Sequence, residues 1–329
     1  MATIEEGLAK FTNHYMERLG PVEIEVVKNV GSIKERYIVK SDKLKAENYP
    51  NILHHGHRTQ DIIVLIHGYT SSPYYVQAIA TRFYAEGVNV VIPLLPAHGL
   101  KDPDKAMKDY ELDSKWKEEI DNAVDVAHML GDSISIGGFS AGGALSLNKV
   151  LRHPNEIRGG VFLFSAVLDV GIIREVAGRI RFLQAITRIT VGKIKGIGRN
   201  PYRYPEMPSF AGVEVTQIIR ENKELSKGKI ISQAVFAAHS VHDTVGKIEG
   251  VLGLLKNHVD HGLAFVISEH VSHADLVLAE NIKLYDIPGA EPEEEPLANP
   301  KFEWMMDDAT GFFKKYIVKN EEKEVGDSL

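Results

Sequence analysis

A serine set between closely spaced glycines is the residue of this sequence best suited to do chemistry. Ser140 stands in Gly138-Phe139-Ser140-Ala141-Gly142, after the β-prone run 133–136 and before an apolar stretch typical of a helix, 144–150. This G-x-S-x-G pattern on a strand–turn–helix holds the serine in a strained backbone conformation and raises its Oγ above the end of a sheet. A Cβ in place of either glycine would meet the adjoining strand and helix. Such a serine becomes a nucleophile when an imidazole takes its proton; the alternative is a tight turn with an incidental serine.

Alternating strands and helices must position this serine. Continuous apolar runs typical of buried parallel strands occupy residues 61–66, 89–93, 133–139, 160–165, 230–238 and 262–268. Helices are predicted at 3–19, 73–86, 113–130 and 303–319, and two antiparallel strands at 22–30 and 36–40. This order predicts an α/β fold, with a mostly parallel central sheet covered by helices on both faces.

Residues 41–60 are polar and are predicted to be irregular. They include His54, His55 and His57, which lie close enough together to raise a metal site. No carboxylate motif accompanies them, so a solvated loop is the preferred interpretation.

Composition narrows the classes of function. The chain of 329 residues has a net charge of −7, which argues against a nucleic-acid partner, and it has no cysteine, which excludes disulfides, thiolate catalysis and Cys-ligated metals. The first residues are acidic where a signal peptide would be basic, and no apolar run reaches transmembrane length. These observations predict a cytoplasmic protein without stable membrane insertion, although transient contact with a lipid surface stays open.

Together these features resemble the α/β-hydrolase fold, in particular its carboxylesterase, monoacylglycerol lipase and lysophospholipase branch. The resemblance rests on His67-Gly68 after one buried strand, Pro96-Ala97-His98-Gly99 after the next, the Ser140 turn, an acid after a later strand and a histidine after the last. It covers the chain from about residue 60 onward. The family usually shows glycine where Ala97 stands, a small departure.

The resemblance implies an acid and a base that follow the serine in the order Ser, Asp, His. Asp243 matches the family's acid, which holds the imidazole tautomer and stabilises the imidazolium; its alternative role is the N-cap of a helix that begins near residue 244. His273 lies 30 residues further on and precedes Ala-Asp-Leu-Val-Leu, as the family's catalytic histidine does, and His270 is the fallback. His239 and His242 have no counterpart in the family pattern and could line the site.

An oxyanion hole requires two backbone N–H groups aimed at the developing negative charge. The resemblance assigns one to Ala141, directly after the nucleophile, and the other to Tyr69, in the turn after His67-Gly68. Because the amides act, the side chains at these positions matter only for geometry. His67 and His98 are expected to be structural residues of their turns.

The resemblance implies a helical cap after the strand at 160–165, and ordinary packing on the sheet is the alternative for the same residues. Apolar residues recur there at intervals of three and four, as in an amphipathic helix that could cover an acyl group: Ile172, Val176, Ile180, Leu183 and Ile186. Residues 170–205 carry eight basic side chains against Glu175 alone: Arg174, Arg179, Arg181, Arg188, Lys193, Lys195, Arg199 and Arg203. Two interpretations stay open, a solvated face whose long side chains cover apolar surface and a surface that attracts an anionic amphiphile or lipid.

The sequence thus predicts a serine hydrolase of carboxylic esters that needs no cofactor or metal and acts on a small ester with an apolar acyl group. Core residues 1–169 and 230–329 would enclose a cap at 170–229. Amidase, thioesterase or acyltransferase activity would suit the same residues, whereas a dehalogenase or epoxide hydrolase would place aspartate at position 140. A non-catalytic binder with a lidded pocket is the alternative of a different class. The acidic, Pro-rich segment 289–300 is expected to be an exposed loop without chemistry, and a partner-binding role for it would rest on composition alone.

Overall fold

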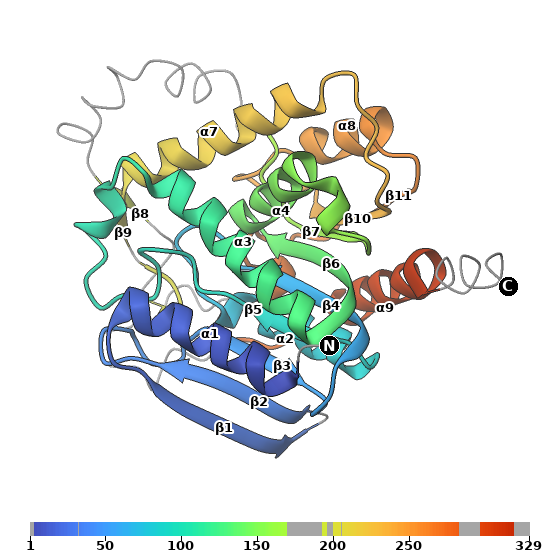
Figure 1. The fold of residues 1–329 in the computed structure, drawn as a ribbon. Helices are drawn as coiled ribbons and strands as arrows, with labels where there is room; N and C mark the ends of the chain where they lie inside the picture. The colour runs from blue at the N-terminus through green and yellow to red at the C-terminus, as the bar shows by residue number, and fades with distance from the viewer. Residues whose placement is uncertain are drawn as a thin grey trace, which may run out of the picture.

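The protein is seen here in a computed structural model that describes residues 3–31, 33–169, 193–195, 200–204, 206–282 and 297–318 (Figure 1). Nine strands of the described residues form one sheet: β1 Glu23–Val30, β2 Ile33–Lys40, β3 Asn51–His54, β4 Thr59–Ile66, β5 Asn89–Ile92, β6 Gly131–Phe139, β7 Val161–Phe164, β10 Val235–Ser240 and β11 Gly262–Ile267. Two further strands, β8 Lys193–Lys195 and β9 Glu206–Pro208, pair with each other in antiparallel fashion.

The order across the sheet is β1-β2-β3-β5-β4-β6-β7-β10-β11. The strands from β5 to β11 pair in parallel, and β1, β2 and β3 add an antiparallel edge. The mostly parallel sheet predicted from the apolar runs is therefore confirmed. Its centre, β4 and β6, is the pair whose carboxyl ends lead into the turns at His67 and Ser140.

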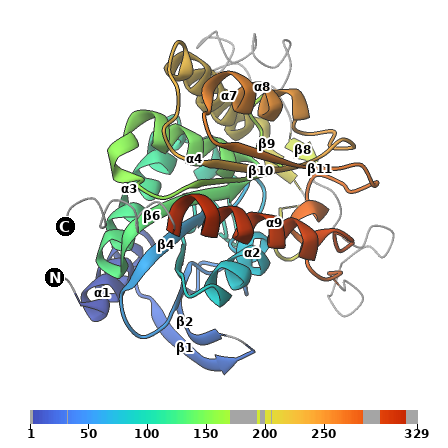
Figure 2. The same cartoon turned by 90° about the vertical axis from the view of Figure 1, so that its right-hand side faces the viewer.

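Helices cover both faces of the sheet. Their bounds are α1 Ile4–Leu19, α2 Tyr74–Ala85, α3 Leu112–Leu130, α4 Ala141–Arg152, α7 Ser209–Ser226, α8 Ile248–His258 and α9 Phe302–Phe313. Figure 2 shows α2 and α9 on one side of the sheet and α3, α4 and α8 on the other. Successive β4 residues divide between the two cores, with Ile62 and Val64 packed toward α1, α3 and α4 and Ile63 and Leu65 toward α2 and α9. This is the pattern of a strand buried on both faces.

Two predictions for the polar stretch 41–60 are wrong in part, although residues 41–50 are irregular and His57 is exposed as expected. Residues 51–54 form β3, which pairs with both β2 and β5. His54 ends that strand and is buried, and the ring of His55 stacks on Tyr84 at 3.9 Å, so these side chains are packed rather than solvated. In the described part of the chain, no group of three or more His, Asp or Glu side chains is placed to hold a metal ion.

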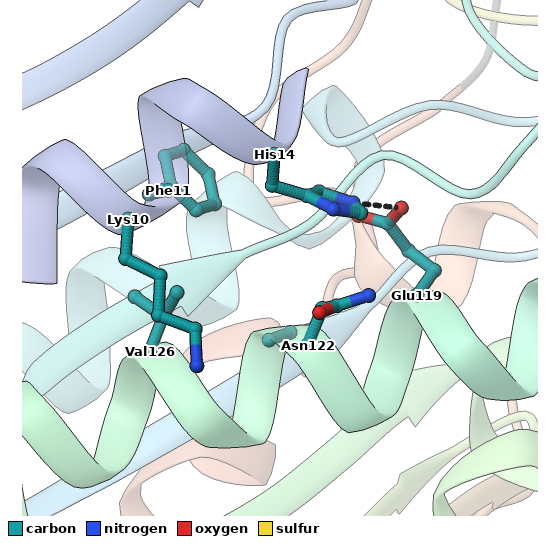
Figure 3. A pocket seen from close by; sticks show the side chains of 7 residues that line it. Lys10, Phe11, His14, Glu119, Asn122 and Val126 are labelled. Carbon is teal, nitrogen blue, oxygen red and sulfur yellow. Dashed lines mark hydrogen bonds and ion pairs between the residues drawn. The ribbon is translucent and has the colours of Figure 1, made fainter. Parts of the chain in front are cut away.

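A buried carboxylate joins α1 to α3. Glu119 of α3 is only 2% exposed and binds three side chains of α1. Tyr15 Oη donates to it at 2.6 Å, His14 Nε2 lies 2.7 Å away (Figure 3), and Arg18 forms an ion pair with it. The amphipathic helix predicted at 3–19 is thereby fixed against the sheet's helical layer.

Parts of the predicted cap lie outside the described residues. These include the amphipathic helix expected at 172–186 and most of the basic segment 170–205. Most of the acidic segment 289–300, which is separate from the cap, also lies outside the described residues. The described portion of 170–229 includes α7, which packs across α4, where Asn222 donates to the Ala144 carbonyl at 2.7 Å. In the ranges that the structure describes, no helix combines the length and apolarity needed to span a bilayer.

Candidate active site

Ser140 lies in the sharp turn between β6 and α4. Its backbone has φ 57° and ψ −120°, a region that residues other than glycine rarely adopt. Hydrogen bonds on both sides hold this conformation, because its N–H donates to the Phe164 carbonyl at 3.0 Å and its carbonyl accepts from the Val167 amide at 3.2 Å. The hydroxyl side chain therefore stands at the carboxyl end of the central strands, and the residue is 6% exposed.

The glycines around this turn are required by close backbone contacts. A Cβ on Gly142 would lie 2.1 Å from the Ile66 carbonyl oxygen, and one on Gly138 would lie 2.5 Å from the same atom. A Cβ on Gly68 would lie 2.9 Å from the Ser140 Cβ. These contacts confirm the steric reason for G-x-S-x-G and place the turn after β4 directly beside the serine.

The side chains of Ser140, His273 and Asp243, predicted from separate parts of the sequence, form one line of contacts. His273 Nε2 lies 2.8 Å from Ser140 Oγ, and His273 Nδ1 lies 2.6 Å from Asp243 Oδ2. The carboxylate can only accept, so Nδ1 carries the proton and Nε2 is free to accept from the hydroxyl. The fallback, His270, is exposed, and its ring lies beside His242 with centroids 4.8 Å apart.

Asp243 is held as an ionised carboxylate by three groups, the His273 imidazole and two backbone amides. Its Oδ1 accepts from the amides of Val245 at 2.8 Å and Gly246 at 3.0 Å, and its side chain is fully buried. Burial alone would raise the pKa of this carboxyl, but the hydrogen bond and charge of His273 and the two amides outweigh it, so the pKa is lower than usual. The N-cap alternative is wrong, because α8 begins at Ile248 and Asp243 closes a turn before it.

The two amides predicted to form an oxyanion hole belong to the residue after Ser140 and the residue after Gly68, and Gly68 lies against Ser140. Ala141 opens α4, and Tyr69 follows Gly68. Neither N–H donates a hydrogen bond to a backbone carbonyl within the described residues. The Tyr69 side chain also makes a contact of its own, because its hydroxyl donates to the Pro208 carbonyl at 2.9 Å and attaches the turn after β4 to β9.

His67 and His98 have the surroundings of structural residues. His67 is fully buried, accepts from the Leu95 amide at Nε2 and donates from Nδ1 to the Gly68 carbonyl. Burial lowers the pKa of His67 to about 4, so the ring is neutral. Ala97, beside His98, has φ 69°. That left-handed backbone explains why the family prefers glycine there.

Sequence reasoning left one neighbour of the site without a role. His239 is buried near the end of β10, and its Nε2 lies 3.3 Å from Asp243 Oδ2. The signal was its position on the strand that leads to the acid. The sequence could not show that the His239 side chain points toward Asp243, because that contact depends on the path of the turn after β10.

A mostly parallel sheet with a strained serine turn after a central strand defines the α/β-hydrolase fold. The chain belongs to the alpha/beta hydrolase family, whose model matches residues 63–241. A thermostable monoacylglycerol lipase of Bacillus sp. (strain H-257) is 24% identical over 111 residues, which cover 34% of this chain and 42% of that lipase. The match therefore spans less than half of the relative's length.

Solved structures share the fold at low sequence identity. A chain from a study of LipS and LipT, two metagenome-derived lipolytic enzymes, has a TM-score of 0.65 and 18% identity, covering 83% of this chain and 99% of that one. The monoacylglycerol lipase of Paleococcus ferrophilus has a TM-score of 0.54 and 18% identity, covering 78% and 94%. A soluble variant of the monoglyceride lipase of Saccharomyces cerevisiae has a TM-score of 0.55 and 13% identity, covering 90% and 96%.

Proposed function

We propose that this chain is a serine hydrolase that cleaves carboxylic esters through an acyl-enzyme on Ser140. The observation that carries the proposal is the line of contacts from Ser140 Oγ through the His273 imidazole to the buried Asp243 carboxylate. Family membership and the lipase relative support the ester bond as the target.

Each residue has one task in the proposed reaction. His273 Nε2 takes the hydroxyl proton as Ser140 Oγ attacks the ester carbonyl, and it then gives that proton to the leaving alcohol. Water attacks the acyl-enzyme with His273 again as the base, which releases the acid and restores the serine. Asp243 keeps the proton on Nδ1 and stabilises the imidazolium.

The oxyanion of both tetrahedral intermediates would lie between the Tyr69 and Ala141 amides. Each such donor contributes about 3 kcal/mol to transition-state stabilisation in related chemistry. A cap at residues 170–229, an apolar acyl group and a cytoplasmic location belong to the proposal as predictions from the sequence. The cap and the apolar acyl group predict a small, apolar ester as the substrate. A screen of ester chain lengths would define the preferred acyl group.

The test combines a covalent label with turnover. A fluorophosphonate probe should label the folded wild-type protein, and a short p-nitrophenyl ester should be hydrolysed. Ser140→Ala should abolish both, whereas Ser232→Ala, at an exposed serine remote in sequence from the turn, should change neither. Absence of labelling in folded wild type would favour a non-catalytic binder, and substantial turnover by Ser140→Ala would mean that another residue is the nucleophile.

A further inference from the structure

His239 is a buried titratable side chain beside the site that the proposed reaction leaves unused. It is 1% exposed, and its Nε2 lies 3.1 Å from the Gly246 carbonyl oxygen and 3.3 Å from Asp243 Oδ2. Both oxygens can only accept, so Nε2 must carry a proton. Its Nδ1 is buried and has no hydrogen-bond partner within the described residues.

The contacts of His239 close the turn that holds Asp243. The Gly246 amide donates to Asp243 Oδ1, and the Gly246 carbonyl accepts from His239. The same imidazole nitrogen lies 3.3 Å from Oδ2, the oxygen that binds His273, although its hydrogen bond goes to the Gly246 carbonyl. The ring thus touches the turn and the carboxylate at once.

We propose that His239 is a positioning residue, which closes the Asp243 turn and places a partial positive charge beside the carboxylate oxygen that binds His273. The inference rests on the proposed function, in which Asp243 orients the base. His239 touches neither the reacting hydroxyl nor a substrate, so it acts only through Asp243.

The charge state of His239 suits this role. Burial is the largest influence and lowers the pKa of His239, and nearby His273 lowers it further, against Asp243, the Gly246 carbonyl and Glu249 of α8, which raise it. The ring is therefore neutral at neutral pH. A neutral ring offers Asp243 a dipole without adding a second cation that would compete with the His273 imidazolium.

Removal of this N–H should have two consequences. The carboxylate would lose a positive neighbour, so its charge would act more fully on His273 and favour the imidazolium. The acid limb of the pH–rate profile would then move to higher pH. The turn 243–246 would also loosen, which would slow the reaction through poorer orientation of the imidazole.

The experiment compares His239→Phe, which keeps a ring but has no donor, with His239→Gln, whose side-chain amide can reach the same acceptors. In His239→Phe we expect kcat to fall roughly tenfold with little change in KM and the acid limb of kcat/KM to move up by about half a pH unit. His239→Gln should restore both. The matched control is His242→Gln, in the loop directly after β10, whose exposed ring contacts the Ser268 carbonyl and not the acid.

A second readout needs no turnover. The proton NMR resonance of His273 Nδ1–H should move in His239→Phe and stay in place in His239→Gln and in the control, because it reports the hydrogen bond to Asp243. A moved resonance in a protein that hydrolyses no ester would support the positioning role and contradict the proposed function. An unchanged resonance and acid limb in active, folded His239→Phe would overturn the positioning role alone.

The donor itself is tested separately. If His239→Gln shifts as His239→Phe does, hydrogen-bond donation is not the cause and the inference fails. If His239→Phe does not fold, His239→Asn replaces it, since its shorter amide falls short of the Gly246 carbonyl. The same shifts are expected, and their absence in folded His239→Asn would overturn the proposal.

Discussion

At the residue scale, the position of the Ser140 hydroxyl depends on backbone packing rather than on the serine side chain. A residue in this conformation costs about 1–3 kcal/mol, and it persists because Phe164 at the end of β7 binds its N–H and Val167 in the following loop binds its carbonyl. The turn has no room to relax, since Gly138 and Gly142 both face the Ile66 carbonyl. Small additions to this turn should therefore move the hydroxyl.

We expect Gly142→Ala to lower both stability and turnover. Its Cβ would sit 2.1 Å from the Ile66 carbonyl oxygen, so either β4 or α4 must shift. Overpacking of this kind costs about 1–3 kcal/mol, and a displacement of about 1 Å between Ser140 Oγ and His273 Nε2 would lower kcat roughly 100-fold. Chemical denaturation and ester turnover would measure the two effects.

The control for this prediction is Gly311→Ala in α9, where a Cβ would meet nothing within 4 Å. This exposed helical glycine should accept alanine with an increase in stability of up to about 1 kcal/mol and unchanged kcat. Equal turnover by Gly142→Ala and Gly311→Ala would show that the turn tolerates a Cβ, contrary to the contact distances.

The sequence predicted which residues gather at the site better than how they are held. Ser140, Asp243 and His273 were named from motif order, and the structure brings them together, while their catalytic roles stay a proposal. The contact of His239 with Asp243 could not be predicted, because the return of the chain at Gly246 sets it. The Tyr69 anchor on Pro208 was missed for the same reason, since 139 residues separate the partners.

At the scale of elements, a buried carboxylate of α3 binds three side chains of α1, whose apolar residues also pack in the core. Burial alone would raise the pKa of Glu119, but the charge of Arg18 and the hydrogen bonds of His14 and Tyr15 outweigh it, so the pKa is lower than usual. The ionised form is therefore the one that the folded protein stabilises.

We predict that Glu119→Ala will destabilise the protein by about 3–5 kcal/mol, because it leaves Arg18 and Tyr15 without their buried partner. The control is Asp125→Ala, also on α3, whose ion pair with Lys10 of α1 is exposed. That change should cost no more than about 1 kcal/mol. Urea unfolding of both variants would measure the difference.

The cost of Glu119→Ala should also depend on pH. A carboxyl whose pKa is lower in the folded protein stabilises the fold fully when the pH is above its unfolded-state pKa of about 4.3. That stabilisation is lost as the pH falls through the folded-state pKa. The difference in the free energy of unfolding between wild type and Glu119→Ala should therefore be largest near neutral pH and smaller in acid. A gap that stays constant down to acid pH would mean that Glu119 acts through packing and not through its charge.

Elements with strong periodicity were predicted close to their observed bounds, and those set by pairing were not. Predicted and observed bounds agree within two residues for α1, α2 and α3 and for five of the parallel strands, β4, β5, β6, β7 and β11. The start of α9 was also predicted within one residue, but α9 ends at Phe313 and not at residue 319. β3 was not predicted, because two of its four residues, Asn51 and His54, are polar and no apolar pattern marks the strand. It is buried only because it pairs with β2 and β5. β10 begins at Val235 rather than at residue 230, since the residues before it contribute only an isolated bridge at Ile231.

At the scale of the whole molecule, charge is unevenly distributed along the sequence. The net charge is −7, yet residues 170–205 alone carry eight basic side chains and one acid. These residues belong to the segment 170–229 that the sequence predicts to form the cap. Clustered charge of one sign raises the local concentration of an opposite ion and speeds its association.

We therefore expect an anionic ester to react faster than a neutral ester of equal chain length at low salt, by roughly tenfold in kcat/KM. The advantage should vanish near 1 M salt, where screening acts over about 3 Å. Arg179→Gln combined with Arg181→Gln should reduce it. The control combines Lys105→Gln with Lys256→Gln, at exposed sites outside the segment 170–205. It changes the net charge by the same amount and should leave the advantage of the anionic ester unchanged. Equal rates without salt dependence would mean that the basic side chains only cover apolar surface, and equal effects of the two double variants would assign any steering to net charge instead of the cap.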